Sequence, residues 1–96
     1  MKIAILNGPN LNLLGKREPE VYGHQTFEDY LTSLRSRYPE VDIQYYQSNV
    51  EGELINEIQR QGFEADGIIF NPGGYTHTSV ALRDAVSAIP APVIEV

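Results

Sequence analysis

Apolar residues follow two alternating patterns along the chain: short uninterrupted runs, and longer stretches in which they recur every three or four positions. Short runs bounded by turn residues predict strands, and the longer spacing predicts helices with one buried side. The runs predict four strands, at residues 2–6, 41–46, 67–70 and 92–96. The spacing predicts three helices, at about 27–38, 49–62 and 78–89, each lying between two strands.

Polar and glycine residues suggest where these helices begin and end. Thr26 is expected to cap the first helix. Ser48 and Glu51 have the spacing of a capping box, and Gly62 is expected to end the second helix in a left-handed conformation. The third helix is expected to begin at about Thr78 and to end before the proline that follows it.

The alternation of strands and helices with short connections predicts a single domain, 1–96, in which helices cover both faces of a parallel sheet. The second strand alternates apolar and polar residues, so we expect it at an edge, whereas the first and third strands are apolar throughout. This pattern favours the flavodoxin-like three-layer α/β/α arrangement with strand order 2-1-3-4. Because no helix follows the last apolar run, we expect the domain to be C-terminally incomplete, with a fifth strand beyond Val96.

One connection is much longer than the others. Residues 7–25 have no apolar period, although strand-to-helix connections usually take about 2 to 6 residues, and long loops in compact domains are often functional. In a sheet of this order, ligands bind beyond the carboxyl ends of strands one and three. We therefore expect the site between the loops that begin at Asn7 and at Asn71, the second of which contains Gly73 and Gly74.

Composition and charge narrow the possible functions. Thirteen acidic residues against seven Lys and Arg give a net charge of -6, which opposes binding to nucleic acid or to an anionic membrane surface. The sequence contains no Cys and two His without metal-ligand spacing, so we expect neither a disulfide nor a metal site. No apolar run approaches the roughly 18 residues of a membrane span, and we expect a cytoplasmic protein.

Two other functions of the same topology are disfavoured by the residues at the strand ends. A phosphate-accepting receiver domain needs acidic residues after strands one and three to hold magnesium, but Asn7 and Asn71 stand there. A flavin module expects a Ser/Thr-rich phosphate loop after strand one, where residues 8–12 read Gly-Pro-Asn-Leu-Asn. The sequence therefore supports neither function.

The long loop contains a candidate base, Tyr22, with Arg17 five residues before it. A tyrosine hydroxyl titrates near 10, so its use as a base at neutral pH requires a pKa lower by up to about 3 units, or roughly 4 kcal/mol. A nearby guanidinium is a possible source of that stabilisation. Taken without context, however, both residues, like His77, are more typical of ordinary exposed loop positions.

Two long segments carry a specific resemblance. Residues 8–23 read Gly-Pro-Asn-Leu-Asn-Leu-Leu-Gly-Lys-Arg-Glu-Pro-Glu-Val-Tyr-Gly, and residues 71–85 read Asn-Pro-Gly-Gly-Tyr-Thr-His-Thr-Ser-Val-Ala-Leu-Arg-Asp-Ala. They resemble the opening and central signatures of type II 3-dehydroquinate dehydratases, in the same order, and the resemblance extends over all 96 residues. Family members are longer and carry a His-x-Ser-Asn segment directly after a strand that ends like residues 94–96.

The resemblance implies a lyase of the shikimate pathway of aromatic amino acid biosynthesis. Such an enzyme converts 3-dehydroquinate to 3-dehydroshikimate by anti elimination of water through an enolate, without metal or organic cofactor. Tyr22 would be the base, made basic by Arg17, and Asn12 would hold a water that stabilises the enolate together with the backbone of the glycine loop. The acid would be a histidine at position 97, oriented by Glu95.

The resemblance also implies the substrate contacts and the assembly. Asn71, Gly73, Gly74 and His77 would contact the substrate, and Asp84 would reach the site of a neighbouring subunit in a trimer-based homododecamer. The 96-residue chain alone would be inactive, because the acid and a substrate-binding arginine lie beyond its end. One alternative stays open: an inactive fragment of such an enzyme that only binds a small anionic ligand.

Overall fold

The structure, a computed structural model, describes residues 1–96 except for the side chain of Tyr22. One parallel sheet has the strand order β2-β1-β3-β4, which confirms the predicted order. Its strands are β1 (Lys2–Asn7), β2 (Asp42–Gln47), β3 (Gly67–Asn71) and β4 (Val93–Glu95).

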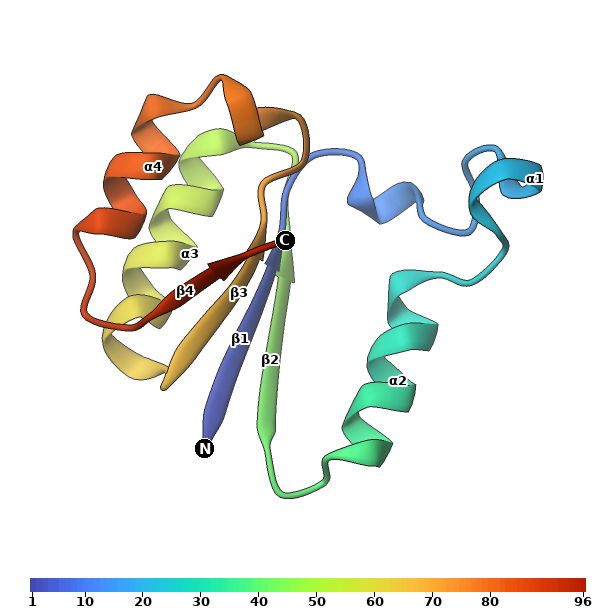
Figure 1. Cartoon of the computed structure of the whole chain (residues 1–96), viewed down its shortest axis with the longest axis horizontal. Coiled ribbons are helices and arrows are strands. Elements are labelled where there is room, and N and C mark those ends of the chain that lie inside the picture. The colour runs from blue at the N-terminus through green and yellow to red at the C-terminus, as the bar shows by residue number, and fades with distance from the viewer.

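Helices cover both faces of this sheet, as expected for a three-layer fold. Helix α2 (Phe27–Arg37) lies on one face, and α3 (Glu51–Glu64) and α4 (Val80–Ser87) pack side by side on the other (Figure 1). The connection from β1 to α2 holds two short helical turns that the apolar pattern does not reveal, η1 (Leu11–Leu13) and α1 (Pro19–Tyr22). A further short turn, η2 (Gly73–His77), follows β3.

Two apolar cores follow from the alternation of side chains along the strands. The larger core lies between the sheet and helices α3 and α4, and its buried members are Ala4, Leu6, Leu54, Ile58, Ile68, Phe70, Leu82 and Ala85. The smaller core lies against α2 and contains Ile5, Leu31 and Ile43. Each fully buried Leu or Ile contributes about 1.5–3 kcal/mol through removal of apolar surface from water. Burial on both faces explains why β1 is an uninterrupted apolar run.

The predicted capping box at the start of α3 is wrong. The N-cap is Val50, and Ser48 lies before it, accepting from Val50 N (2.9 Å) and donating to Glu53 (2.5 Å). Glu51 accepts a hydrogen bond from the hydroxyl of Ser79 instead. This bond joins the start of α3 to the start of α4, a tertiary contact that local spacing does not reveal.

Gly62 does not end its helix, which contradicts the second boundary prediction. Helix α3 continues to Glu64, and Gly62 is buried within it. A Cβ at Gly62 would lie 2.4 Å from Cγ2 of Ile89, so glycine is needed because the segment after α4 packs directly on the helix backbone.

The other two N-caps are formed by hydroxyl side chains. Thr26 caps α2 as predicted, through reciprocal hydrogen bonds with Asp29 at 3.1 and 3.2 Å. Helix α4 begins at Val80, two residues later than expected, because Ser79 is its N-cap and accepts from Leu82 N at 3.0 Å.

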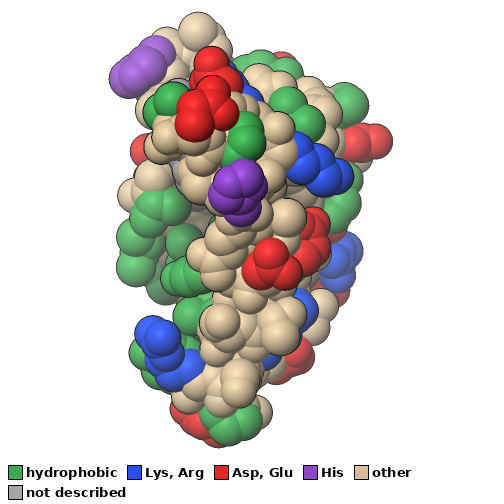
Figure 2. Space-filling view, turned by 90° about the vertical axis from the view of Figure 1, so that its right-hand side faces the viewer, with side chains coloured by type: hydrophobic (Ala, Val, Ile, Leu, Met, Phe, Trp, Pro, Cys, Tyr) green, Lys and Arg blue, Asp and Glu red, His purple; other side chains and the backbone are tan. Residues whose placement is uncertain are grey.

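Residues 8–26, named here the arm, extend from the carboxyl end of β1 toward the side of the sheet that carries α2 (Figure 1). Asn10 and Glu18 in the arm adopt left-handed conformations, with φ of 71° and 40°. The face that carries the arm and α2 mixes acidic and basic side chains (Figure 2). Within the described residues, no helix combines the length and apolar character that crossing a membrane requires.

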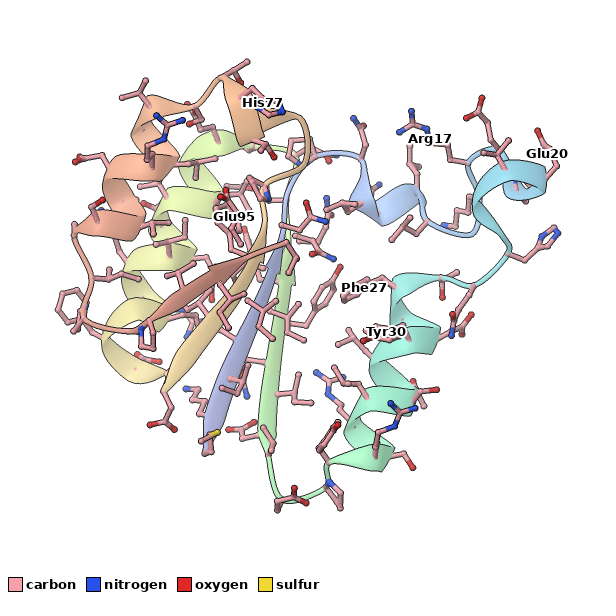
Figure 3. All side chains as sticks on the ribbon, viewed as in Figure 1. Arg17, Glu20, Phe27, Tyr30, His77 and Glu95 are labelled. Carbon is pink, nitrogen blue, oxygen red and sulfur yellow. The ribbon has the colours of Figure 1, made fainter. Side chains whose placement is uncertain are left out.

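Tyr45 connects α2 to the sheet. Its ring stacks on Phe27 with centroids 4.9 Å apart, and Asn7 Nδ2 lies 3.4 Å from its hydroxyl as a donor. Figure 3 shows Phe27 directed from the first turn of α2 toward β2. Burial raises the pKa of Tyr45 above its ordinary value of 10.0; the hydrogen bond from Asn7 opposes this rise, and the charge of Glu28 adds to it.

This pKa shift predicts a loss of stability at alkaline pH. Because the pKa of Tyr45 is higher in the folded than in the unfolded chain, its contribution is fully present below about pH 10 and is lost as the pH rises through the folded value. Tyr45→Phe should therefore make the decline in unfolding free energy above about pH 10 less steep, as measured by urea denaturation. Tyr38→Phe, at a tyrosine that is 45% exposed, is the control. An equally steep decline in Tyr45→Phe would contradict the assignment.

Candidate functional site

The loops that follow β1 and β3 touch backbone to backbone. The N–H of Gly8 donates to the carbonyl of Asn71 at 2.7 Å. A Cβ at Gly8 would lie 2.4 Å from Pro72 O, and a Cβ at Gly73 would lie 2.9 Å from Pro9 O. Gly73 also has a φ of +62°. Glycine is required at both positions, because any side chain would push the two loops apart.

A cleft of about 360 Å³ lies between these two loops. It is lined by Pro9, Asn10, Leu11, Leu14, Arg17, Gly73 and Gly74. The cleft lies at the carboxyl ends of the central strands β1 and β3, where the strand order changes direction and where ligands bind in this class of sheet. Its lining of loop backbone, apolar side chains and one guanidinium suits a small anionic ligand.

Asn71 fixes the shape of the glycine turn. Its Oδ1 accepts from the N–H of Gly73 at 3.1 Å, and the hydroxyl of Thr76 donates to the carbonyl of Gly73 at 2.7 Å. Because Oδ1 is used within the turn, the Nδ2 donor of Asn71 is the part of this side chain left for a ligand.

Two amide side chains, one at the end of β2 and one just after it, hold the start of the arm. Nε2 of Gln47 donates to Gly8 O (3.1 Å), to Asn49 Oδ1 (3.1 Å) and to Asn12 Oδ1 (3.5 Å). Asn49 Oδ1 also accepts from the backbone N–H of Asn10 at 2.9 Å. Sequence reasoning missed Gln47 and Asn49. The available signal was that two amides follow a strand expected next to β1.

The predicted site residues fall into separate groups in the structure. Arg17, Gly73 and Gly74 line the cleft, and Asn12 lies on η1 next to lining residues of the arm. His77 is exposed at the end of η2 and is not among the lining residues. Figure 3 shows Arg17 on the arm, apart from His77 on the loop after β3.

Three further predicted residues lie outside this cleft or cannot be placed. Asp84 is exposed on α4. Glu95 on β4 borders a second hollow of about 190 Å³ against α4, and the turn 72–76 contributes residues to both hollows. The side chain of Tyr22 lies outside the described residues. Among the described side chains, no group of three His, Cys, Asp or Glu residues could hold a metal ion.

Together, these features define a doubly wound, flavodoxin-like α/β protein with a cleft built from loop backbone at the strand switch point. The chain matches the family model described as Dehydroquinase class II over residues 1–96. It therefore belongs to the class II dehydroquinase family.

Individual relatives agree with this assignment. The chain is 54% identical over 97 residues to a 3-dehydroquinate dehydratase of Exiguobacterium sp., covering all of this chain and 66% of the relative. It is 57% identical over 98 residues to the enzyme of that name from Pelotomaculum thermopropionicum, covering 68% of it. The crystal structure of type II dehydroquinase from Butyrivibrio crossotus matches with a TM-score of 0.87 at 45% identity, over 99% of this chain and 68% of that one. The chain thus spans about two thirds of the length of these relatives.

The close contact between Gly8 and the backbone of Pro72 predicts an effect of substitution on stability. Gly8→Ala places a Cβ against backbone that cannot rotate away, so we expect the unfolding free energy to fall by about 1–3 kcal/mol in urea denaturation. Gly52→Ala is the matched control, because Gly52 lies in α3 with open space around it and should gain up to about 1 kcal/mol from helix propensity. Equal effects of the two substitutions would contradict the close contact.

Proposed function

We propose that the full-length protein containing these 96 residues is a 3-dehydroquinate dehydratase that removes water from 3-dehydroquinate to give 3-dehydroshikimate. The observation that carries the proposal is the cleft that Arg17 of the arm lines together with Gly73 and Gly74. Membership of the class II dehydroquinase family supports the choice of reaction. The substrate is a small carboxylate, which suits a cleft with one guanidinium in a chain of net charge -6.

In the proposed mechanism, Tyr22 removes a proton from the carbon next to the substrate ketone. A phenolate that acts as a base near neutral pH needs a pKa up to about 3 units below 10, which corresponds to roughly 4 kcal/mol. The guanidinium of Arg17, five residues earlier in the arm, supplies the positive charge that stabilises the phenolate. Closure of the arm over a ligand would strengthen this interaction by excluding water.

The enolate that forms carries its negative charge on the former ketone oxygen. Asn12 and the backbone of Gly73 and Gly74 are proposed to stabilise this charge, partly through a bound water. Space around Gly74 supports its part, because nothing lies within 4 Å of the position of a Cβ there. Loss of the hydroxyl group, with a proton from an acid, completes the elimination.

The remaining roles follow the family resemblance. A histidine at position 97 is proposed as the acid, oriented by Glu95, and Asn71 and His77 as substrate contacts. Asp84 is proposed to reach a neighbouring subunit in a trimer-based dodecamer, which its exposed position on α4 permits. In this proposal the 96 residues form part of a cytoplasmic enzyme. The chain of 96 residues alone would then bind a small anion without turning it over.

Two substitutions test the proposed roles in the full-length protein. Tyr22→Phe should remove the base and Arg17→Ala the charge that stabilises it, and each should lower kcat by about 10²- to 10⁴-fold. The enone absorbance of 3-dehydroshikimate measures the rate. Tyr30→Phe and Arg37→Ala, both at exposed residues of α2, are matched controls that should retain the wild-type rate. Wild-type turnover in Tyr22→Phe would contradict the choice of base, and an inactive full-length wild type would contradict the proposed function.

A further inference from the structure

We propose that Gln47 is a positioning residue that holds the side-chain amide of Asn12 with its oxygen toward β2 and its two N–H donors toward the ligand. The orientation follows from hydrogen-bond partners in the structure alone. The effect on catalysis rests on the proposed function.

Two backbone groups fix the orientation of the side-chain amides of Gln47 and Asn49, at the end of β2 and just after it. The N–H of Asn10 can only donate, so the atom of Asn49 that lies 2.9 Å from it must be Oδ1. The carbonyl of Gly8 can only accept, so the atom of Gln47 that lies 3.1 Å from it must be Nε2. Nε2 of Gln47 also meets the fixed Oδ1 of Asn49 at 3.1 Å, so the two assignments agree.

The fixed amide of Gln47 favours one orientation of Asn12. Nε2 of Gln47 carries two N–H groups and meets Oδ1 of Asn12 at 3.5 Å in addition to two acceptors at 3.1 Å, so one N–H is shared between two of these oxygens. If the amide of Asn12 were flipped, its N–H donors would face the N–H donors of Gln47. Nδ2 of Asn12 is therefore directed away from Gln47, and no described residue accepts a hydrogen bond from it. Two N–H donors are what a bound water or a developing oxyanion requires.

The position of Gln47 in the fold gives this arrangement its rigidity. Gln47 is the last residue of β2, is half-buried, and pairs in register with Asn7 of β1. Its amide thus extends from the sheet to an exposed residue of the arm, and sites supported by regular elements hold their geometry better than loops do. The same amide donates to the carbonyl of Gly8, so it also supports the start of the arm, whose next residues line the cleft.

Two substitutions in the full-length protein separate orientation from simple packing. Gln47→Met keeps the side-chain length but loses the donor, and Gln47→Glu replaces the donor by an acceptor that favours the flipped amide of Asn12. Gln44→Met is the control on the same strand, where the amide donates to Asp42 at 2.7 Å. We expect kcat to fall by about 10- to 100-fold in both Gln47 variants, while KM stays nearly unchanged. This loss is smaller than the one expected when an oxyanion donor is removed altogether, because Asn12 itself is still present. Gln44→Met should retain the wild-type kcat.

A double substitution tests whether Gln47 acts through Asn12. In an Asn12→Ala background, Gln47→Met should lower kcat by less than about 2-fold, because the group that it orients is already gone. An equal fold-loss in both backgrounds would overturn the proposal, since it would mean that Gln47 only supports packing. Wild-type kcat in Gln47→Glu, in an active full-length enzyme, would overturn it too.

A measurement that does not depend on enzyme activity distinguishes the positioning role of Gln47 from the proposed function. In ¹⁵N-labelled full-length protein, Gln47→Glu should shift the side-chain NH₂ signals of Asn12, and Gln44→Met should leave them in place. Unchanged Asn12 signals in Gln47→Glu would overturn the positioning role whether or not the protein is a dehydratase. An inactive wild type with shifted signals would reject the proposed function and retain the amide orientation.

Discussion

The candidate site depends on one contact, the backbone junction between the loops after β1 and β3. The two loops are joined by the hydrogen bond from Gly8 to Asn71 at 2.7 Å, and no Cβ fits between Gly8 and Pro72 or between Gly73 and Pro9. Neighbouring parallel strands bring the two loops to one edge of the sheet, and glycine allows them to meet. The cleft, with Arg17 and the glycine turn on its walls, forms around this junction.

The sheet supports this junction from both sides. On one side, Asn71 at the end of β3 accepts from the N–H of Gly73 and holds the glycine turn. On the other, Gln47 at the end of β2 bonds Gly8, the first residue of the arm. Amide side chains thus stand at the ends of three neighbouring strands, since Asn7 of β1 lies in register with both Gln47 and Asn71. Amides suit this place because each both donates and accepts without introducing a charge.

The sequence predicted those features whose causes are local. Thr26 caps α2 as expected because its partner Asp29 is three residues away, and the alternating pattern of β2 correctly placed that strand at an edge. Glu51 and Gly62 were misread because their partners, Ser79 and Ile89, are distant in sequence. Local rules could not reveal that one pairs across helices and that the other makes room for a packed side chain.

For the site, the sequence located the two loops but not their support. The glycine turn and the unusually long arm were visible as patterns, and Arg17, Gly73 and Gly74 do meet at the cleft. The hydrogen bonds of Gln47 depend on the sheet register and on the path of the arm, neither of which a sequence period encodes. The roles assigned to Tyr22 and Glu95 stay predictions that rest on the family resemblance.

The most direct test of this account is a titration of the ¹⁵N-labelled full-length protein with 3-dehydroshikimate, followed by backbone amide shifts. If the junction between the loops builds the ligand site, the largest shifts will fall on Asn10, Leu11, Gly73 and Gly74, with amides of α2 and of the outer face of α3 unchanged. Shifts centred on the hollow between β4 and α4, with the glycine turn and the start of the arm unaffected, would contradict it.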